Sequence, residues 1–529
     1  MTEPVHRGAV RAASTALSLA LLLALATFLV PYLPFQDLPA HGGLIALRER
    51  LRHAGSESAF YVLDEQLNPY FVFRVTGDLL ARVLGPVGAV RVLGFLPVVL
   101  IPFALAKADQ RVSGVLRTEA LAIGLLVALG FMTLMGFASF LLAMAFYTFL
   151  VGLSLTELER SEDEGATASN GAWKRRASLA ALTAALVLVH GHAFLLLGLT
   201  LACFFFARPN RRAAKHLFLT LAPAALFALF LFVRQNLTIA PAAAAKIPYA
   251  PLGTRFQGPL AKLGLLATPT LFSRFGIDAL IALTLVVYAA AIVFVASRNF
   301  RSGTLRQRRL LIAIGAFSLL FVGLPHSIGW FGFVDGRLLM PIIFLVVLLR
   351  GSVIDGGARA SGARDSSLVQ KGLLHFEHAA PFFALIQAVV VVVATFLFQT
   401  EAREFSTVAH LVPADARLLY LPFRSESRFV TGHPFLHYDK LILAEHPLVV
   451  SQFWWHQGTG IYPTEKSPAI AIPRNYLELD QGKPHWDRMA LDSWTHVLVR
   501  GSDSVPEQAH LILQSGDFRL YSRVAEARN

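Results

Sequence analysis

The sequence predicts a polytopic α-helical membrane protein with a small α/β domain outside the membrane. Of its 529 residues, 55% are hydrophobic and only 15% are charged, whereas about a quarter of a typical soluble chain is charged. The apolar residues form blocks such as "ALSLALLLALATFLV" and "FFALIQAVVVVVATFLF", each near the roughly 20 residues that cross a bilayer core. The strands of a membrane barrel alternate apolar and polar residues, and these blocks do not.

The charge pattern excludes a nucleic-acid partner, although the formal net charge is +13. Lys and Arg lie mainly in short links between apolar blocks, where the positive-inside rule explains them. They form no basic stripe interleaved with aromatic residues. Cys203 is the only cysteine and lies in an apolar block, so neither a disulfide framework nor a cysteine-based metal site is expected.

Orientation follows from the basic residues near the ends of the spans. We expect the N-terminus inside, as an uncleaved anchor, and a first span over residues 12–33. Outer loops are expected at 34–67 and 235–275, and a partly interfacial helix near residues 68–90. Residues 118–156 are long enough for two spans with a reversal near Gly136. A second span is expected to end before "KADQRVSGVLR", and later spans lie near 217–234, 277–297, 310–327, 338–350 and 380–400. Together with two short helices within residues 178–206, this gives about eleven spans in all.

Two further segments complete the predicted architecture. The block around "LVHGHAFLLLGL" has basic flanks on both sides, which favours two short helices that bend at His190–His192. After the transmembrane domain (1–400), residues 401–529 contain the strand-like pieces "DARLLYLPF", "THVLVRG" and "DFRLYSR" between Pro/Gly-rich segments. We therefore expect a C-terminal extracytoplasmic α/β domain.

This topology brings ionisable residues from separate segments to the outer surface. Such groups are costly at membrane depth and usually face an interior cavity. The candidates are Asp37, His41, Asp64, Glu65, His190, His192, Arg255, His326, Asp335 and Arg337.

Asp37 lies between two prolines just after the first span, in "PYLPFQDLPAHGG". A carboxylate beside a partly dry cavity can act as a general base. It can equally cap the helix that follows. His41 could orient Asp37 or bind an anion, or it could simply lie in the first turn of that amphipathic helix.

The other candidates also have a structural alternative. Asp64 and Glu65 are adjacent and fit solvated loop acids better than a catalytic pair. His190 and His192 would need further ligands to hold a metal, and otherwise satisfy backbone groups freed at a helix bend. Arg337 could hold a phosphate with its bidentate fork, snorkel to the interface, or pair with Asp335.

The outer loop 235–275 carries four cations against the positive-inside trend. They make a basic outer surface that suits anionic lipid head groups. These cations are Lys246, Arg255, Lys262 and Arg274.

The motifs "FQDLPAH", "MGFASFLLAMAFYTFL", "LVHGHAFLLLGL" and "FVDGRLLMP" resemble the GT-C class of integral-membrane glycosyltransferases. The resemblance covers the layout of residues 10–400. It implies an enzyme of the bacterial inner membrane that moves a sugar from a polyprenyl-phosphate carrier to a glycan, lipid or protein acceptor. The N-terminus would be cytoplasmic and the C-terminal domain extracytoplasmic.

The resemblance also implies roles for single residues. Asp37 matches the acid of the first outward loop and would take the proton from the acceptor, with Arg337 and the loop cations stabilising the departing phosphate. Loop one lacks the Asp-x-Asp pattern of the metal-using members. A divalent metal is therefore possible for the class but not supported here, and no other cofactor is expected.

Two other functions fit the same sequence. A transporter or flippase for a lipid-linked or anionic solute would show broken helices in symmetric positions and charges in mid-span. Mid-span charges are few here, and the polar groups gather at one surface. A non-catalytic envelope assembly protein, whose outer domain binds a partner, is the other alternative.

Overall fold

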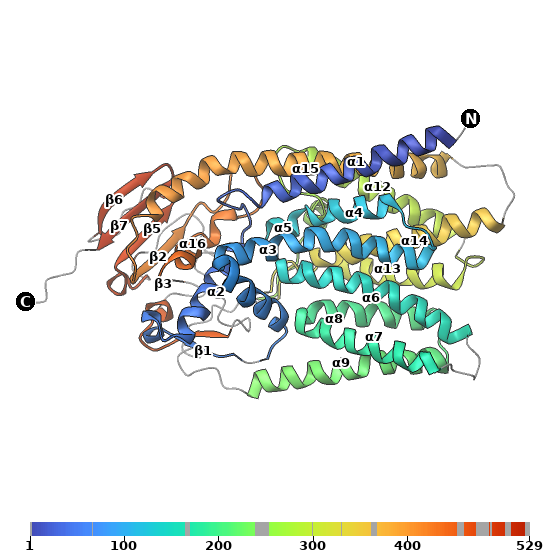
Figure 1. Cartoon of the computed structure of the whole chain (residues 1–529), viewed down its shortest axis with the longest axis horizontal. Coiled ribbons are helices and arrows are strands. Elements are labelled where there is room, and N and C mark those ends of the chain that lie inside the picture. Colours follow the sequence, from blue (N-terminus) through green and yellow to red (C-terminus); the bar gives the residue numbers. More distant parts are fainter. Residues whose placement is uncertain are drawn as a thin grey trace, which may run out of the picture.

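The computed structural model describes residues 3–523 except 66, 164–169, 238–252, 299, 329–330, 361–367, 452–459, 472–485, 487–488 and 503–508. Helices dominate it, in a bundle that carries a sheet domain at one end (Figure 1). The helices are α1 Glu3–Thr27, α2 Leu38–Arg52, α3 Phe71–Ser113, α4 Thr118–Ala128, α5 Phe131–Leu134, α6 Ala138–Asp163, α7 Asn170–Val189, α8 Gly191–Phe206, α9 Arg211–Leu237, α11 Pro259–Leu265, α12 Ile277–Arg298, α13 Leu305–Gly323, α14 Leu339–Ala360, α15 Leu368–Ala409 and α16 Asp439–Glu445.

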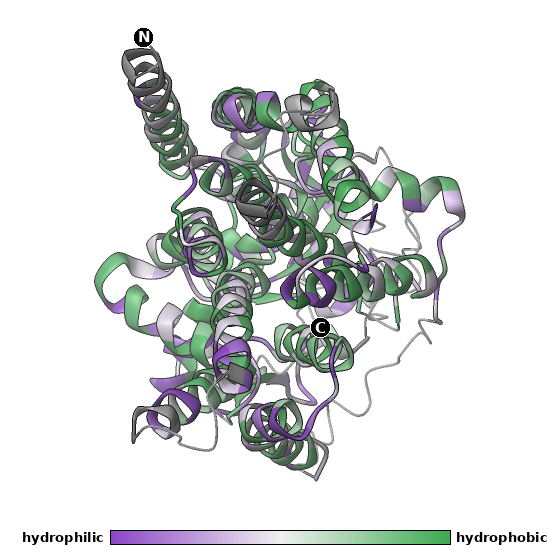
Figure 2. Cartoon of the chain, turned by 90° about the vertical axis from the view of Figure 1, so that its right-hand side faces the viewer, coloured by the Kyte–Doolittle hydropathy of each residue, from purple (hydrophilic) through white to green (hydrophobic). Residues whose placement is uncertain are grey.

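Among the described residues, five helices are long and apolar enough to cross a membrane. They are the segments Phe71–Ser113, Ala138–Glu162, Arg211–Arg234, Ile277–Arg298 and Gly372–Ala409. This finding supports the predicted membrane protein, while the number of eleven spans and their orientation stay predictions. Seen end-on, much of the helical ribbon consists of hydrophobic residues (Figure 2).

Local sequence explains where the helices break. In α3, Gly85 has a φ of 71° and precedes Pro86, so a kink separates its first part from the apolar remainder. The predicted reversal near Gly136 is confirmed, because α5 ends at Leu134 and α6 begins at Ala138. The predicted bend at His190 is also confirmed, since this residue is extended between α7 and α8.

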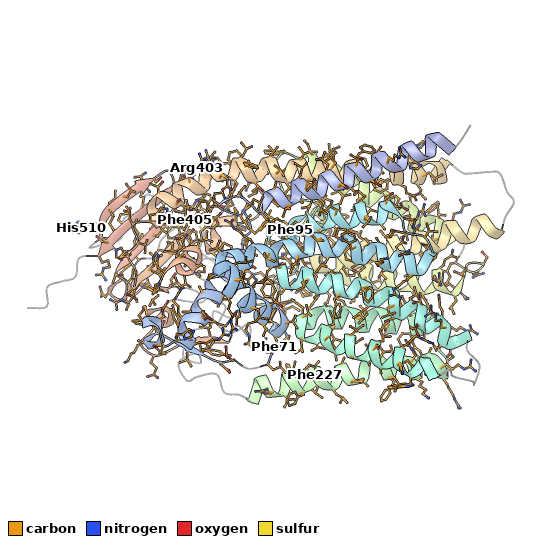
Figure 3. The ribbon with its side chains drawn as sticks, in the orientation of Figure 1. Phe71, Phe95, Phe227, Arg403, Phe405 and His510 are labelled. Carbon is orange, nitrogen blue, oxygen red and sulfur yellow. The ribbon has the colours of Figure 1, made fainter. Side chains whose placement is uncertain are left out.

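The last long helix differs from the prediction. The composition changes at residue 400, but α15 continues to Ala409. Phe405 lies near the end of α15 (Figure 3). The centroid of its ring is 5.1 Å from that of Tyr438 and 5.6 Å from that of Phe518. The helix therefore reaches into the sheet domain and anchors it to the bundle.

The C-terminal domain contains a five-stranded mixed sheet in the order β3-β2-β5-β7-β6. Strand β2 is parallel to β3 and β5, and the remaining pairs are antiparallel. The three predicted strand-like pieces are confirmed as β2, β5 and β7. The strands are β2 Ala416–Pro422, β3 Leu448–Val450, β5 His496–Arg500, β6 Ala509–Ser515 and β7 Phe518–Arg523.

The first loop and the C-terminal domain fold together. Strand β1 (Tyr61–Leu63) pairs antiparallel with β4 (Ile461–Pro463), and α16 packs against α2. The Tyr438 hydroxyl, just before α16, donates a 3.0 Å hydrogen bond to the Leu33 carbonyl at the end of the first apolar segment. The N-terminal end of α1 and the sheet lie at opposite ends of the molecule (Figure 1).

Candidate active site

Asp37 is held by its backbone in the turn between α1 and α2. Its amide donates to the Met135 carbonyl at 3.1 Å, and the Gln36 amide donates to the Leu134 carbonyl at 2.9 Å. Gly136 has a φ of 74°, and a Cβ at this position would lie 2.8 Å from the Asp37 nitrogen. A glycine is required here because the two backbones approach so closely.

The Asp37 side chain does not cap α2, since the N-cap has no side-chain hydrogen bond. Its Oδ1 accepts from Gln36 Nε2 at 3.3 Å and lies 3.6 Å from His437 Nε2. His437 comes from the C-terminal domain, in the short 3₁₀ helix η3 (Pro434–His437). Burial, and then the charges of Lys440 and His41, hold the pKa of His437 well below its usual value. Asp37 therefore faces an imidazole that is neutral at pH 7.

His41 lies one turn further along α2, with its ring centroid 4.8 Å from that of Phe73. Burial, followed by the nearby Arg48 charge, lowers the pKa of His41 to about 4. His41 also contributes to the lowered pKa of His437. Two neutral imidazoles thus lie near the carboxylate, and neither is a cation that could bind an anion at pH 7.

Arg337 lies in η2 (Gly336–Leu338), just before α14. Its guanidinium carbon lies 4.2, 4.7 and 5.3 Å from the ring centroids of Phe331, Phe137 and Phe140. The side chain is buried instead of snorkelling outwards, and its Nε has no hydrogen-bond partner. Within the described part of the chain, no carboxylate forms an ion pair with it.

Arg337 nevertheless stays charged. Burial lowers the pKa of Arg337 to about 10, opposed by the charges of Tyr70 and Asp37. Phe137, one of the rings under the guanidinium, directly follows Gly136, which contacts the Asp37 backbone, so Arg337 and Asp37 lie in the same part of the molecule. A charged guanidinium held over aromatic faces without a paired carboxylate can receive an anionic ligand.

His190 and His192 join this group. The His190 ring lies 5.2 Å from the Tyr70 ring and 6.3 Å from that of His192. Both imidazoles pack on Phe140, one of the rings beneath Arg337. His190 Nδ1 and His192 Nε2 are buried without a hydrogen-bond partner, so both can still bind a polar ligand group.

The described residues contain no group of three or more His, Cys, Asp or Glu that could hold a metal ion. The two histidines add hydrogen-bonding capacity beside the guanidinium.

Asp335, His326 and Lys262 form a separate cluster. Asp335 Oδ1 accepts from the Gly336 amide at 2.8 Å and lies 2.9 Å from His326 Nδ1. Its Oδ2 lies 3.3 Å from Lys262 Nζ. Asp335 is therefore engaged by Lys262 and His326, and it orients the turn that carries Arg337 instead of pairing with Arg337.

The remaining predicted residues lie on surrounding loops. Glu65 is half exposed and pairs with Arg52 of α2, as expected for a solvated loop acid. The Asp64 amide donates to the Gly460 carbonyl at 2.6 Å, beside the β1–β4 pair. Arg255 is exposed and forms an isolated bridge with Ser327, whereas Lys246 lies outside the described residues. A substrate role for these residues stays a prediction.

Sequence reasoning missed several residues of this site. His437 is distant in sequence and sits in an unremarkable segment, "TGHPFLHYDK". Phe137, Phe140 and Phe331 look like ordinary apolar residues of spans and loops. Tyr70 carried a weak signal, because it lies in the loop motif "LNPY" directly before a helix.

Comparison with known proteins gives a similarity of structure but none of sequence family. No protein-family model and no curated protein match the chain. Among solved structures, the chain is similar to the oligosaccharyltransferase of Archaeoglobus fulgidus, in its crystal structure with zinc and sulfate, at a TM-score of 0.45 and 12% sequence identity. The similarity covers 92% of this chain and 68% of that chain.

Proposed function

We propose that the protein is an integral-membrane glycosyltransferase of the GT-C type. It would move a sugar from a polyprenyl-phosphate carrier to a glycan, lipid or protein acceptor at the outer membrane face. The observation that carries the proposal is the buried Arg337 guanidinium, which has no paired carboxylate in the described part of the chain. It lies over Phe137, and Phe137 directly follows the Gly136 that contacts the Asp37 backbone. A carboxylate and an anion-binding guanidinium are the two charged groups that transfer from a sugar phosphate requires.

In this proposal Asp37 acts as the general base. Its carboxylate would take the proton from an acceptor hydroxyl as the oxygen forms a bond to the anomeric carbon. Two features support this role: the backbone fixes the residue, and the neighbouring His437 is neutral. A neutral imidazole orients the carboxylate without protonating it.

Arg337 is placed to stabilise the leaving group. When the bond between the anomeric carbon and the phosphate oxygen breaks, the electron pair stays with the carrier phosphate. The guanidinium is buried, charged at pH 7 and restrained by three phenylalanine rings, so it can stabilise that charge with little reorganisation. The free nitrogens of His190 and His192 would bind oxygens of the phosphate or hydroxyls of the sugar.

Three variants in reconstituted vesicles test the proposal. With a polyprenyl-phosphate-linked sugar as donor, Asp37→Asn should still bind the donor but release no free polyprenyl phosphate, because it lacks the base. Arg337→Lys should lose donor affinity, because lysine keeps the charge but not the fork. Glu49→Gln is the control, since Glu49 is a half-exposed carboxylate of α2 that pairs with Arg52.

The donor is first identified by comparing lipid-linked sugars in a deletion strain with those of its parent. A strain carrying Asp37→Asn should accumulate the same lipid as the deletion strain. An unchanged glycan profile in the Asp37→Asn strain would refute the role of this residue. Movement of the intact lipid-linked sugar across the bilayer, with no bond broken, would instead show a flippase.

A further inference from the structure

The short helix α11 has an unusual distribution of side chains. Leu260 and Leu263 face outwards with 84% and 61% of their surfaces exposed, whereas Lys262 is buried. A helix in water presents the opposite arrangement, with its lysines outside and its leucines inside. Two neighbouring residues extend the apolar surface, namely Phe256 with 68% and Ile328 with 51% exposed. We call Phe256, Leu260, Leu263 and Ile328 the α11 patch.

The orientation of α11 is fixed by its buried lysine. Lys262 Nζ donates to the carbonyls of Phe321 and Leu324, both at 2.6 Å. It also lies 3.3 Å from Asp335 Oδ2. These contacts attach α11 to the end of α13 and to the turn before α14. The outward direction of Leu260 and Leu263 is therefore a consequence of specific contacts.

The patch lies where an apolar helix begins. The membrane-spanning candidate α12 starts at Ile277, twelve residues after α11 ends, and the segment between them contacts the sheet domain through Arg274 and Phe429. The patch therefore lies between a candidate membrane span and the sheet domain. Arg255, beside the patch, and Arg274 are both exposed cations.

We propose that α11 lies in the plane of the outer leaflet, with the α11 patch immersed among the lipid chains and Arg255 at the head groups of anionic phospholipids. Burial of the apolar side chains and attraction of the arginine to phosphate drive the insertion together. The ion pair of Lys262 with Asp335 then holds the turn that carries Arg337 near the head-group level. A lipid phosphate could thus reach the guanidinium without leaving the leaflet.

The proposal does not depend on the transferase reaction. A flippase or an assembly protein with the same fold would insert α11 in the same way. Only the position of Arg337 near the head groups bears on the proposed function. An experiment can therefore refute the insertion of α11 without refuting the glycosyltransferase function, and the reverse.

Site-directed spin labelling measures how deep the α11 patch lies in the bilayer. Cys203 is the only cysteine and is buried, so an introduced cysteine is the one that reacts. A nitroxide at Leu260→Cys is compared with labels at two exposed leucines, Leu283→Cys on α12 and Leu511→Cys on β6. The protein is placed in vesicles of phosphatidylcholine and phosphatidylglycerol, and collisions with oxygen and with a water-soluble nickel chelate are measured.

We expect the ratio of oxygen to nickel collisions at Leu260→Cys to be several-fold above that at Leu511→Cys and below that at Leu283→Cys. In vesicles of phosphatidylcholine alone, the label at Leu260→Cys should lie closer to the water, with a lower ratio of oxygen to nickel collisions. Adding Arg255→Gln should make this ratio the same in both kinds of vesicle. Nickel access equal to that of Leu511→Cys would overturn the proposal. Equally, low access to both reagents would overturn it, since protein would then cover the patch.

Discussion

Replacement of Gly136 by alanine would test whether the backbone contact beneath Asp37 is as close as the structure shows. Gly136 has a φ of 74°, which costs an L-residue about 1–2 kcal/mol. The added Cβ would also lie 2.7 Å from the Leu38 nitrogen and 2.8 Å from the Asp37 nitrogen. Because both are backbone atoms, neither can rotate away, and overpacking of this kind costs about 1–3 kcal/mol more.

We therefore expect Gly136→Ala to reduce the free energy of unfolding by about 2–5 kcal/mol, the sum of these two costs. Gly114→Ala is the matched control. Gly114 has a φ of 83°, but nothing lies within 4 Å of its would-be Cβ. Its free energy of unfolding should decrease only by the cost of the positive φ, about 1–2 kcal/mol.

The assay is thermal unfolding of both variants in the same detergent, followed by release of polyprenyl phosphate at a temperature where both are folded. Gly136→Ala should lower the unfolding temperature more than Gly114→Ala does. It should also reduce turnover, because Asp37 is displaced. Equal unfolding temperatures for the two variants would refute the close approach that we describe.

Three further predictions concern the same end of the molecule. The pKa of His41 is about 4 in the folded chain against 6.5 in the unfolded chain. The free energy of unfolding is therefore highest above pH 6.5 and falls by about 3 kcal/mol as the pH decreases towards 4. In a series of unfolding temperatures measured at different pH values, His41→Asn should show a weaker decrease over this range. Asp78→Ala leaves the buried Arg48 guanidinium without its 2.6 Å partner and should cost about 3–5 kcal/mol in the same unfolding assay. Tyr438→Phe removes the hydrogen bond to the Leu33 carbonyl and should cost about 1–3 kcal/mol, with faster limited proteolysis of the sheet domain as a second measurement.

Several elements were predictable because their signals are local. The alternating residues of "THVLVRG" predicted β5, and the glycine in "LMGFASF" predicted the reversal before α6. The end of α15 was not predictable in this way. Polar residues such as Glu401 predict where a span ends, but α15 continues to Ala409. There Glu401 accepts hydrogen bonds from Ser427 and Arg428 of the sheet domain.

The site was predictable in part for a similar reason. Asp37 and Arg337 stand out in sequence because charge is rare near apolar blocks. The residues around them do not stand out in sequence, because His437, for example, lies near Asp37 only through tertiary packing. Likewise, the phenylalanines around Arg337 come from segments nearly 200 positions apart. Pairing across such distances leaves no periodicity that a single sequence could show.

The ribbon of β1 and β4 has a consequence for how the protein is made. It joins segments about 400 positions apart in the chain. At roughly 5–20 residues per second, a ribosome needs about 20–80 seconds between the emergence of the two strands. During that interval the first loop waits without its partner, exposing the unpaired edge of β1 and the surface of α2 that α16 later covers. The fold of the first loop is therefore completed only after the C-terminal domain has been synthesised.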